Sequence, residues 1–366
     1  MKGNPRFGPN TDLTSMWYFK VSLLLSALIM LSTMAHAETP IPENLLPPAT
    51  DGIWIRPAAG DCIPIYGFKD GIRLGIQPAR RPRGIVRIYA PYVLPEQQYP
   101  AVNFMAIEPI VNGWRSLSEI EHSALDDTRG KRIWFTDLRH PDPPPLPAWN
   151  SSRGRLGTLM VGGKKVETLT VYLNVEKLDN GAQPIVQVMF RSDRPNEVGF
   201  KVYAAKDSAP MESCVITATM GNYSRTRLLW LKDEVMDSRK LWPDYKGNEF
   251  VGTDEIPASR MLRSKDGTLT VAISPSESDL SDVSMPPSGW PFHGKVSTQY
   301  WRKYPGTAQK DLRVKVNGRA SYYGGHAPIP GGVAFENFEL IEGFKAGVES
   351  WFGISLKTPE EMGWPK

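Results

Sequence analysis

The stretch Thr168-Leu-Thr-Val-Tyr-Leu-Asn-Val175, followed by Asp179-Asn-Gly181 and then Val186-Gln-Val-Met-Phe190, decides the fold class. Apolar and polar side chains alternate along both outer segments, and this period of two indicates strands with one buried face. The Asp-Asn-Gly triplet between them is a typical turn sequence. The stretch therefore predicts a strand, a turn and a returning antiparallel strand.

Other β-prone runs recur along the chain, whereas helical patterns are few. The runs cover Ile53–Ile55, Ile72–Ile76, Ile85–Tyr89, Val102–Ile107, Val198–Val202, Val215–Met220, Leu228–Leu231, Leu269–Ile273 and Leu312–Val316. Residues 118–125 could form two helical turns and residues 359–362 one. Because 33 prolines and 32 glycines divide the chain into short runs, we predict an all-β fold, a large antiparallel β-sandwich with few short helices. A barrel is the alternative.

The N-terminus has the order of a secretory signal peptide. Lys20 precedes an apolar run, Val21–Leu31, and the small-residue site Ala35-His-Ala37 follows. The apolar run is shorter than the roughly 20 residues that cross a membrane. We predict a signal peptide over residues 1–37 and an exported bacterial protein, periplasmic or extracellular, with no membrane span after cleavage. The long polar segment before Met16 favours Met16 over Met1 as the start.

Cleavage after residue 37 leaves 366 − 37 = 329 residues and removes three basic residues and one acidic residue, so the formal charge falls from +4 to +2. A nearly neutral chain gives no case for nucleic acid as a partner. We predict one large β-sandwich domain over residues 38–366, with a domain boundary in the proline-rich segment 140–150 as the alternative. The sequence does not set the oligomeric state.

The chain has two cysteines, Cys62 and Cys214. An oxidising compartment would permit a disulfide between them, and two separate buried thiols are the alternative, because spacing does not reveal connectivity. No zinc-site spacing is present, and we predict no cofactor. The acidic segment 276–282 could supply oxygen ligands to calcium, although it lacks the ligand positions of a defined calcium loop.

Titratable side chains concentrate between Glu108 and His122. If this segment is extended, Glu119 and Glu121 lie on one face with Cα atoms about 6.6 Å apart, within the roughly 6.5–9.5 Å carboxylate spacing of inverting glycosidases. If it is helical, Glu119 instead faces His122. Glu119, Glu121 and His122 are therefore candidate catalytic residues, and a solvated acidic edge is the alternative.

Glu108 follows an apolar run and precedes a proline, which biases it towards an extended backbone. We expect it to end a buried strand. Burial would raise the pKa of its carboxyl group and suit a general acid, whereas contact with Arg115 would lower that pKa. Glu108 is thus a candidate catalytic residue with Arg115 as a substrate-binding residue, or the two form a simple ion pair.

A second constellation spans Thr219–Arg227. On a strand, Arg225 and Arg227 point the same way and could neutralise a uronate or sulfate group, with Asn222 as a further polar contact. A polysaccharide lyase also needs a base, for which Tyr223 is the local candidate. The alternative is that the arginines pair with surface carboxylates.

A third constellation, Ile329–Leu340, places Glu336 and Asn337 among apolar neighbours. Buried polar groups without partners cost several kcal/mol. Glu336 is therefore a candidate catalytic residue and Asn337 a candidate substrate contact in a pocket, or both belong to a structural network.

Trp301, Gly318-Arg-Ala-Ser-Tyr-Tyr323 and Pro330–Leu340 resemble stretches of exported bacterial β-proteins of the galactose-mutarotase-like supersandwich type. This resemblance implies a sugar ligand and supplies no catalytic residue, since function does not follow from fold. Trp301 is the candidate aromatic substrate contact. We expect a secreted carbohydrate-active protein that binds a polysaccharide or oligosaccharide and that could cleave it, as a glycoside hydrolase or polysaccharide lyase. The alternative is a non-catalytic glycan-binding or structural protein.

Overall fold

The computed structural model describes residues 50–58, 64–78, 84–91, 101–115, 131, 133–137, 139, 152–219, 221, 224–277, 297–322 and 327–365. All of them belong to one compact unit, which spans residues 42–366. The predicted signal peptide, the proline-rich segment 140–150 and the predicted helical segment 118–125 lie outside the described residues.

The first of two antiparallel sheets has eleven strands among the described residues. In spatial order these are β1 (Thr50–Asp51), β2 (Trp54–Ile55), β3 (Ile65–Phe68), β4 (Arg73–Pro78), β5 (Gly84–Tyr89), β6 (Ala101–Val111), β13 (Ser213–Thr219), β21 (Ala334–Ile341), β20 (Arg313–Arg319) and β16 (Val251–Pro257), with β7 (Trp114–Arg115) paired to β6.

The second sheet also has eleven described strands. Their order is β15 (Val235–Asp237), β14 (Thr226–Trp230), β18 (Leu269–Pro275), β19 (Thr298–Lys303), β22 (Glu349–Ser355), β12 (Glu197–Ala204), β11 (Pro184–Arg191), β10 (Lys164–Val175) and β8 (Ile133–Thr136), while β17 (Leu262–Arg263) pairs with β18 and β9 (Arg155–Val161) with β10.

Helical structure is short. It consists of α3 (Ser238–Leu241) and two 3₁₀ turns, η3 (Ala258–Arg260) and η4 (Glu360–Met362), in the described ranges. Within those ranges we find no helix with the length and apolar character needed to cross a membrane.

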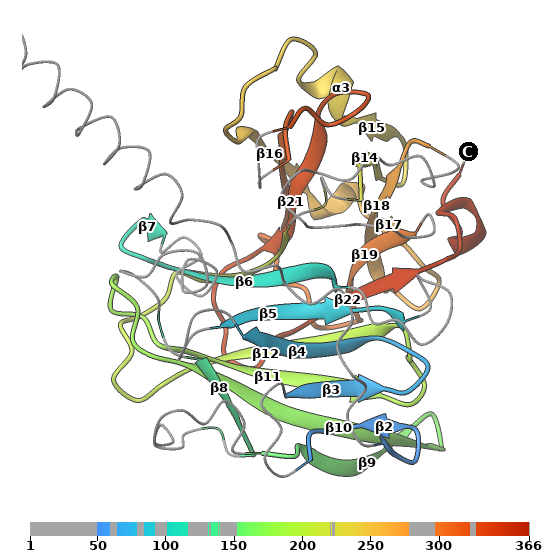
Figure 1. Ribbon diagram of the computed structural model, residues 1–366. Coiled ribbons are helices and arrows are strands. Elements are labelled where there is room, and N and C mark those ends of the chain that lie inside the picture. The colour runs from blue at the N-terminus through green and yellow to red at the C-terminus, as the bar shows by residue number, and fades with distance from the viewer. Residues whose placement is uncertain are drawn as a thin grey trace, which may run out of the picture. The chain divides into compact units, whose positions relative to one another are not determined.

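The hydrophobic core lies between the two sheets. It contains Ile107 of β6 and Ile216 of β13 from the first sheet, together with Val171 of β10, Trp301 of β19 and Phe352 of β22 from the second. Figure 1 shows β4 and β5 of the first sheet lying over β11 and β12 of the second. The predicted all-β sandwich is confirmed.

The predicted hairpin is β10 and β11. Leu169 pairs with Phe190 and Leu173 with Val186 in an antiparallel register, and Gly181 in the connecting segment has a positive φ of 83°. The alternation of apolar and polar residues predicted these two strands correctly because one face of each strand is buried in the intersheet core.

The expectation that Glu108 ends a strand is wrong, since β6 continues through Pro109 to Val111. The carbonyl of the next residue, Ile110, points towards β13 and accepts from the Glu212 N–H at 2.8 Å. The backbone nitrogen and carbonyl of Pro109 therefore point away from β13, and the carbonyl accepts a hydrogen bond from the side-chain amide of Asn180. Neighbouring residues alternate in hydrogen-bonding direction, so the missing N–H of proline removes no bond from the ladder with β13.

Candidate functional site

Two buried arginines converge on one carboxylate next to β14. The Nη1 atom of Arg227 pairs with Oε1 of Glu277, and Nη1 of Arg225 lies 3.7 Å from the same oxygen. The Arg227 Nη2 atom also donates to the carbonyls of Pro330 and Gly332. We call Arg225, Arg227, Glu277 and the neighbouring Tyr322 the arginine cluster.

A tight turn positions Arg225. The N–H of Thr226 and the hydroxyl of Ser224 both donate to the carbonyl of Gly221, at 3.1 and 3.0 Å. Arg225 lies between them in the left-handed region with φ of 49°, which is unfavourable for a residue with a side chain. Arg225 thus precedes β14 instead of lying on a strand with Arg227, as the sequence pattern had suggested, and the two arginines meet at one oxygen of Glu277.

The arginine cluster lies between the sheets. Arg227, on β14 of the second sheet, donates to the carbonyls of Pro330 and Gly332, which precede β21 of the first sheet, and the neighbouring Tyr322 belongs to the intersheet core. On the facing side, Gly331 has φ of 83°, and a Cβ atom there would lie 3.2 Å from the Arg227 Nη2 atom. Glycine therefore allows the backbone before β21 to approach the guanidinium.

Glu336 is tied to the same turn through its backbone. Its carbonyl accepts from the Gly221 N–H at 3.1 Å, and its side chain is buried, with 3% exposure. The neighbouring Asn337 is partly exposed, and its N–H donates to Oδ1 of Asn317 at 3.0 Å. The predicted candidates Arg225, Arg227 and Glu336 are thereby brought to one region of the fold.

Burial and mutual charge set the protonation states of the arginine cluster. Burial alone would raise the pKa of Glu277, but the charges of Arg227 and Arg225 outweigh it, and the pKa is lowered. Burial lowers the pKa of Arg227 despite Glu277. Burial also raises the pKa of Tyr322, against the opposing effect of both arginines. At neutral pH the phenol of Tyr322 therefore keeps its proton.

Positive charge exceeds negative charge in the arginine cluster. Two guanidinium groups share one carboxylate among the described residues, and the nearby Arg239 has its own partner, Asp237, at 2.6 Å. The Nε–H groups of Arg225 and Arg227 are buried and donate to no partner in the described structure. The second oxygen of Glu277 receives a hydrogen bond from Ser276, so both oxygens of this carboxylate already accept a hydrogen bond.

A second charged cluster joins four strands of the first sheet. Arg115 Nη2 pairs with Oε2 of Glu108 and lies 3.0 Å from Oε1 of Glu339. Thr217 Oγ1 donates to Oε2 of Glu339 and lies 3.5 Å from Oε2 of Glu108. We call these four residues the Glu108 cluster. The ion pair between Glu108 and Arg115 was one of the two interpretations of the sequence, and it is present.

The two clusters lie on different sides of the first sheet. Met105 and Ile107 of β6 point into the intersheet core, so Glu108 points to the opposite, outer face. The described structure therefore does not bring Glu108 to Arg225 and Arg227. The other predicted candidates, which are Glu119, Glu121, His122, Asn222 and Tyr223, lie outside the described residues.

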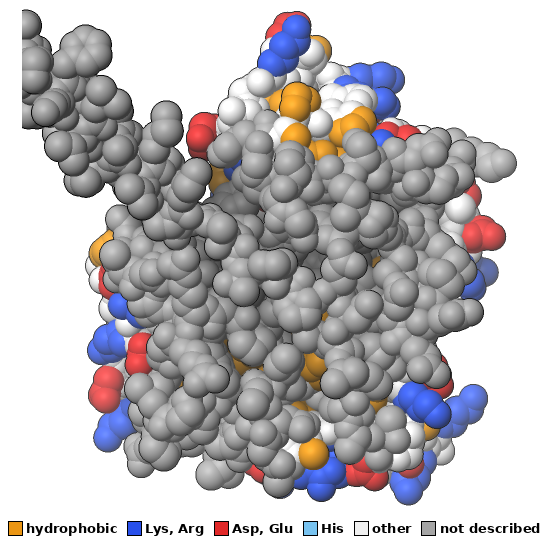
Figure 2. All heavy atoms as spheres, viewed as in Figure 1, with side chains coloured by type: hydrophobic (Ala, Val, Ile, Leu, Met, Phe, Trp, Pro, Cys, Tyr) orange, Lys and Arg blue, Asp and Glu red, His pale blue; other side chains and the backbone are white. Residues whose placement is uncertain are grey.

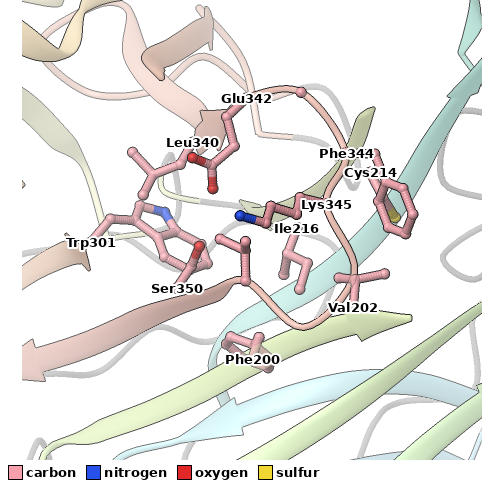
Figure 3. A pocket seen from close by; sticks show the side chains of 12 residues that line it. Phe200, Val202, Cys214, Ile216, Trp301, Leu340, Glu342, Phe344, Lys345 and Ser350 are labelled. Carbon is pink, nitrogen blue, oxygen red and sulfur yellow. The ribbon is translucent and has the colours of Figure 1, made fainter. Parts of the chain in front are cut away.

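Trp301 packs inside the core and lines a small pocket between the sheets (Figure 3). Its side chain is 1% exposed. In Figure 3 the polar ends of Glu342, Lys345 and Ser350 point towards one another above the apolar lining. The pocket offers about 50 Å³ to the centres of water molecules, whereas ligand sites typically measure roughly 300–1,000 Å³. This pocket suits a few water molecules and is too small for a sugar ring.

Metal-ligating side chains do not gather in the described ranges, where no group of three or more His, Cys, Asp or Glu could hold an ion. Glu277, from the acidic segment considered for calcium, pairs with Arg227, and residues 278–282 lie outside the described part. Cys214 is a free thiol, and burial raises its pKa to about 12. Its proposed partner, Cys62, is not among the described residues.

Sequence reasoning missed Tyr322 and Glu277 of the arginine cluster and Thr217 and Glu339 of the Glu108 cluster. Glu277 lies two residues after the end of β18, so the sequence could have indicated a carboxylate near a strand end. Glu339 carried no comparable signal, because its proximity to Glu108 depends on β13 separating β6 from β21.

Comparison with known proteins adds no relative: no protein-family model, no curated protein and no solved structure matches this chain. The resemblance to galactose-mutarotase-like proteins therefore stays a prediction.

Proposed function

We propose that this protein is a secreted glycan-binding protein whose arginine cluster recognises the carboxylate or sulfate of an acidic polysaccharide. The observation that carries the proposal is the pair of buried guanidinium groups that share a single described carboxylate. Arg225 is the principal ligand contact, because it is the less fully paired of the two arginines.

Buried charge explains why an anion belongs there. An unpaired charge in a protein interior is strongly unfavourable, and the planar guanidinium fork binds carboxylate and sulfate oxygens through parallel hydrogen bonds. An acidic sugar would supply the missing negative charge beside the Arg225 guanidinium, whose Nη1 lies 3.7 Å from Glu277 Oε1. The strained backbone of Arg225 fits this role, since strain of this kind gathers at ligand-binding positions.

Among the described residues, the pairing of the carboxylates favours binding over cleavage. A hydrolase needs two carboxyl groups free to act as acid and base, but Glu108, Glu339 and Glu277 are all engaged by arginines. Elimination needs a base beside the neutralising cations, and Tyr322 keeps its proton because burial raises its pKa. Its hydroxyl is better suited to donate a hydrogen bond to an anionic ligand.

Calorimetric titration against matched acidic and neutral glycans tests the proposal. Polygalacturonate, alginate and chondroitin sulfate should bind, with affinity that falls as salt rises, whereas amylose and a neutral β-glucan should not. Arg225→Gln should weaken binding at least tenfold. Arg313→Gln is the matched control, because Arg313 has a 44% exposed side chain paired with Glu255, and it should bind like the unaltered protein.

Equal binding of acidic and neutral glycans, or unchanged binding by Arg225→Gln, would contradict the proposal. Cleavage is read in the same samples. New ultraviolet absorption from a conjugated double bond would indicate elimination, and new reducing ends without that absorption would indicate hydrolysis.

A further inference from the structure

The strand β9 forms an exposed apolar edge of the second sheet. Each of its seven residues is exposed, and among the described strands it pairs only with β10. Leu156, Leu159 and Met160 are 47%, 48% and 70% exposed. Edge strands are normally protected by charges, proline or a covering segment; in β9 the one charged residue is Arg155, and among the described strands none pairs with its outer edge.

The backbone of β9 offers a defined set of hydrogen-bonding groups. In β10, Glu167 directs both its N–H and its carbonyl towards Ser192, on the side away from β9. Its cross-strand neighbour Thr158 must then direct its own N–H and carbonyl away from β10. Hydrogen-bonding direction repeats at every second residue of a strand. The backbone N–H and carbonyl groups of Leu156, Thr158 and Met160 therefore all point to the free edge of β9.

A hollow lies beside this edge. It is lined by Trp54 and Ile53 from the first sheet and by Leu156, Thr158 and Glu167 from the second, with a volume of about 500 Å³ open to the centres of water molecules. Met160 shares the strand face of Leu156 and Thr158. The hollow and the apolar tip of the β9–β10 hairpin therefore belong to one surface.

We propose that β9 pairs with β9 of a second copy of this chain, antiparallel about a two-fold axis through Thr158. In this register Leu156 faces Met160 of the second copy and Thr158 faces its own equivalent. The outward backbone groups of each strand then meet those of the other. Met160 of each copy lies next to the hollow of the other, so the interface is self-complementary, as two-fold symmetry requires.

Charge supports this pairing. The hairpin tip carries Lys164 and Lys165. Glu167 lines the hollow together with Asp51, which pairs with Arg56 of its own chain. Figure 2 shows basic and acidic side chains together at the lower end of the view, where Figure 1 places β9 and β2. The antiparallel arrangement brings the basic tip of each copy towards the acidic hollow of the other.

A lipid surface is the less suitable occupant. Hydrocarbon would leave the outward N–H and carbonyl groups of β9 without partners, at a cost of several kcal/mol for each group, and the carboxylate of Glu167 in the hollow would repel anionic headgroups. A second β-strand satisfies the same groups.

Light scattering after size-exclusion chromatography tests the proposal, with the protein loaded from low micromolar to the highest soluble concentration. The unaltered protein should have the mass of a dimer, and Met160→Glu should have the mass of a monomer with an unchanged circular dichroism spectrum. Leu356→Glu, at a site that is 41% exposed elsewhere on the surface, should remain dimeric.

Crosslinking tests the register. Hydrogen-bonded antiparallel partners have Cα atoms about 5.5 Å apart, within the range that a disulfide spans. Thr158→Cys should form a covalent dimer through residue 158, whereas Arg155→Cys, which faces Val161 in this register, should not. A monomeric unaltered protein, a dimer unaffected by Met160→Glu, or equal crosslinking at both positions would overturn the proposal. So would a monomer that sediments with phosphatidylglycerol vesicles through β9.

Discussion

The indole Nε1 of Trp301, on β19, donates a 2.8 Å hydrogen bond to the backbone carbonyl of Phe338, on β21. These strands belong to different sheets, so this bond crosses the apolar core. The indole ring also packs against Phe352, with ring centroids 5.1 Å apart. Trp301 therefore fixes the separation of the sheets in addition to filling space between them.

Trp301→Phe should lower the free energy of unfolding by about 2 kcal/mol, because it leaves the Phe338 carbonyl without its donor and opens a small cavity. Denaturant titration measures the change. Trp114→Phe is the control, since Trp114 is 55% exposed, and should alter stability by less than about 0.5 kcal/mol. Equal effects of the two substitutions would contradict this role of Trp301.

Arg115→Met should destabilise the fold by about 3 kcal/mol, because Glu108 and Glu339 would face each other without their shared cation. Adding Glu339→Gln to this variant should recover part of the loss by removing one of the two carboxylates. Thermal and denaturant unfolding compare the three proteins. If the second substitution only adds to the loss, electrostatic repulsion is not the cause.

Arg225→Gly should separate ligand binding from stability. Glycine adopts the left-handed backbone of this position without strain, so unfolding free energy should stay within about 1 kcal/mol of the unaltered protein. Binding of acidic glycans should nevertheless fall as it does in Arg225→Gln. A strongly destabilised Arg225→Gly variant that still binds acidic glycans would show that Arg225 serves stability and not ligand binding.

The stability contributed by Glu277 should depend on pH. Because the pKa of Glu277 is lowered from 4.5 by the arginines against the effect of burial, the folded state favours the carboxylate. Its contribution is present above the unfolded pKa and lost as the pH falls through the folded pKa. The stability difference between the unaltered protein and Glu277→Gln should thus be largest near neutrality and shrink in acid. A difference that is constant from pH 7 to about pH 3 would contradict it.

Cys214 should resist alkylation in the native protein. Burial raises its pKa to about 12, and the thiolate is the reactive species. Iodoacetamide at pH 8 should modify residue 214 slowly before unfolding and rapidly in denaturant, as measured by peptide mass. Recovery of a disulfide-linked peptide containing Cys62 and Cys214 would show instead that the thiol is oxidised.

Strand positions could be predicted from the sequence far better than strand partners. The run Ile85–Tyr89 lies in β5, and Leu269–Ile273 forms most of β18. Strands with one or both faces buried need apolar β-prone side chains, and these can be recognised in the sequence. The strand β9 escaped prediction, since its exposed residues show no alternation.

The candidate site was predictable in part. Arg225 and Arg227 were identified because they are close in sequence, although Arg225 lies in a turn before β14 and not on a strand as their spacing suggested. Their partner Glu277 is 50 residues away from Arg227 along the chain, and Glu339 is 224 residues from Arg115. Such contacts depend on which strands are neighbours, and local periodicity carries no information about that order.

The central positions of β21 and β22 determine when this chain can complete its fold during synthesis. β21 lies between β13 and β20, and β22 lies between β12 and β19, although both are made after their neighbours. Until they leave the ribosome, each sheet remains in two halves with open edges. Folding is therefore completed only after nearly the whole described chain has been translated. A chain truncated before Ala334 should lack β21 and β22 and be unable to complete either sheet.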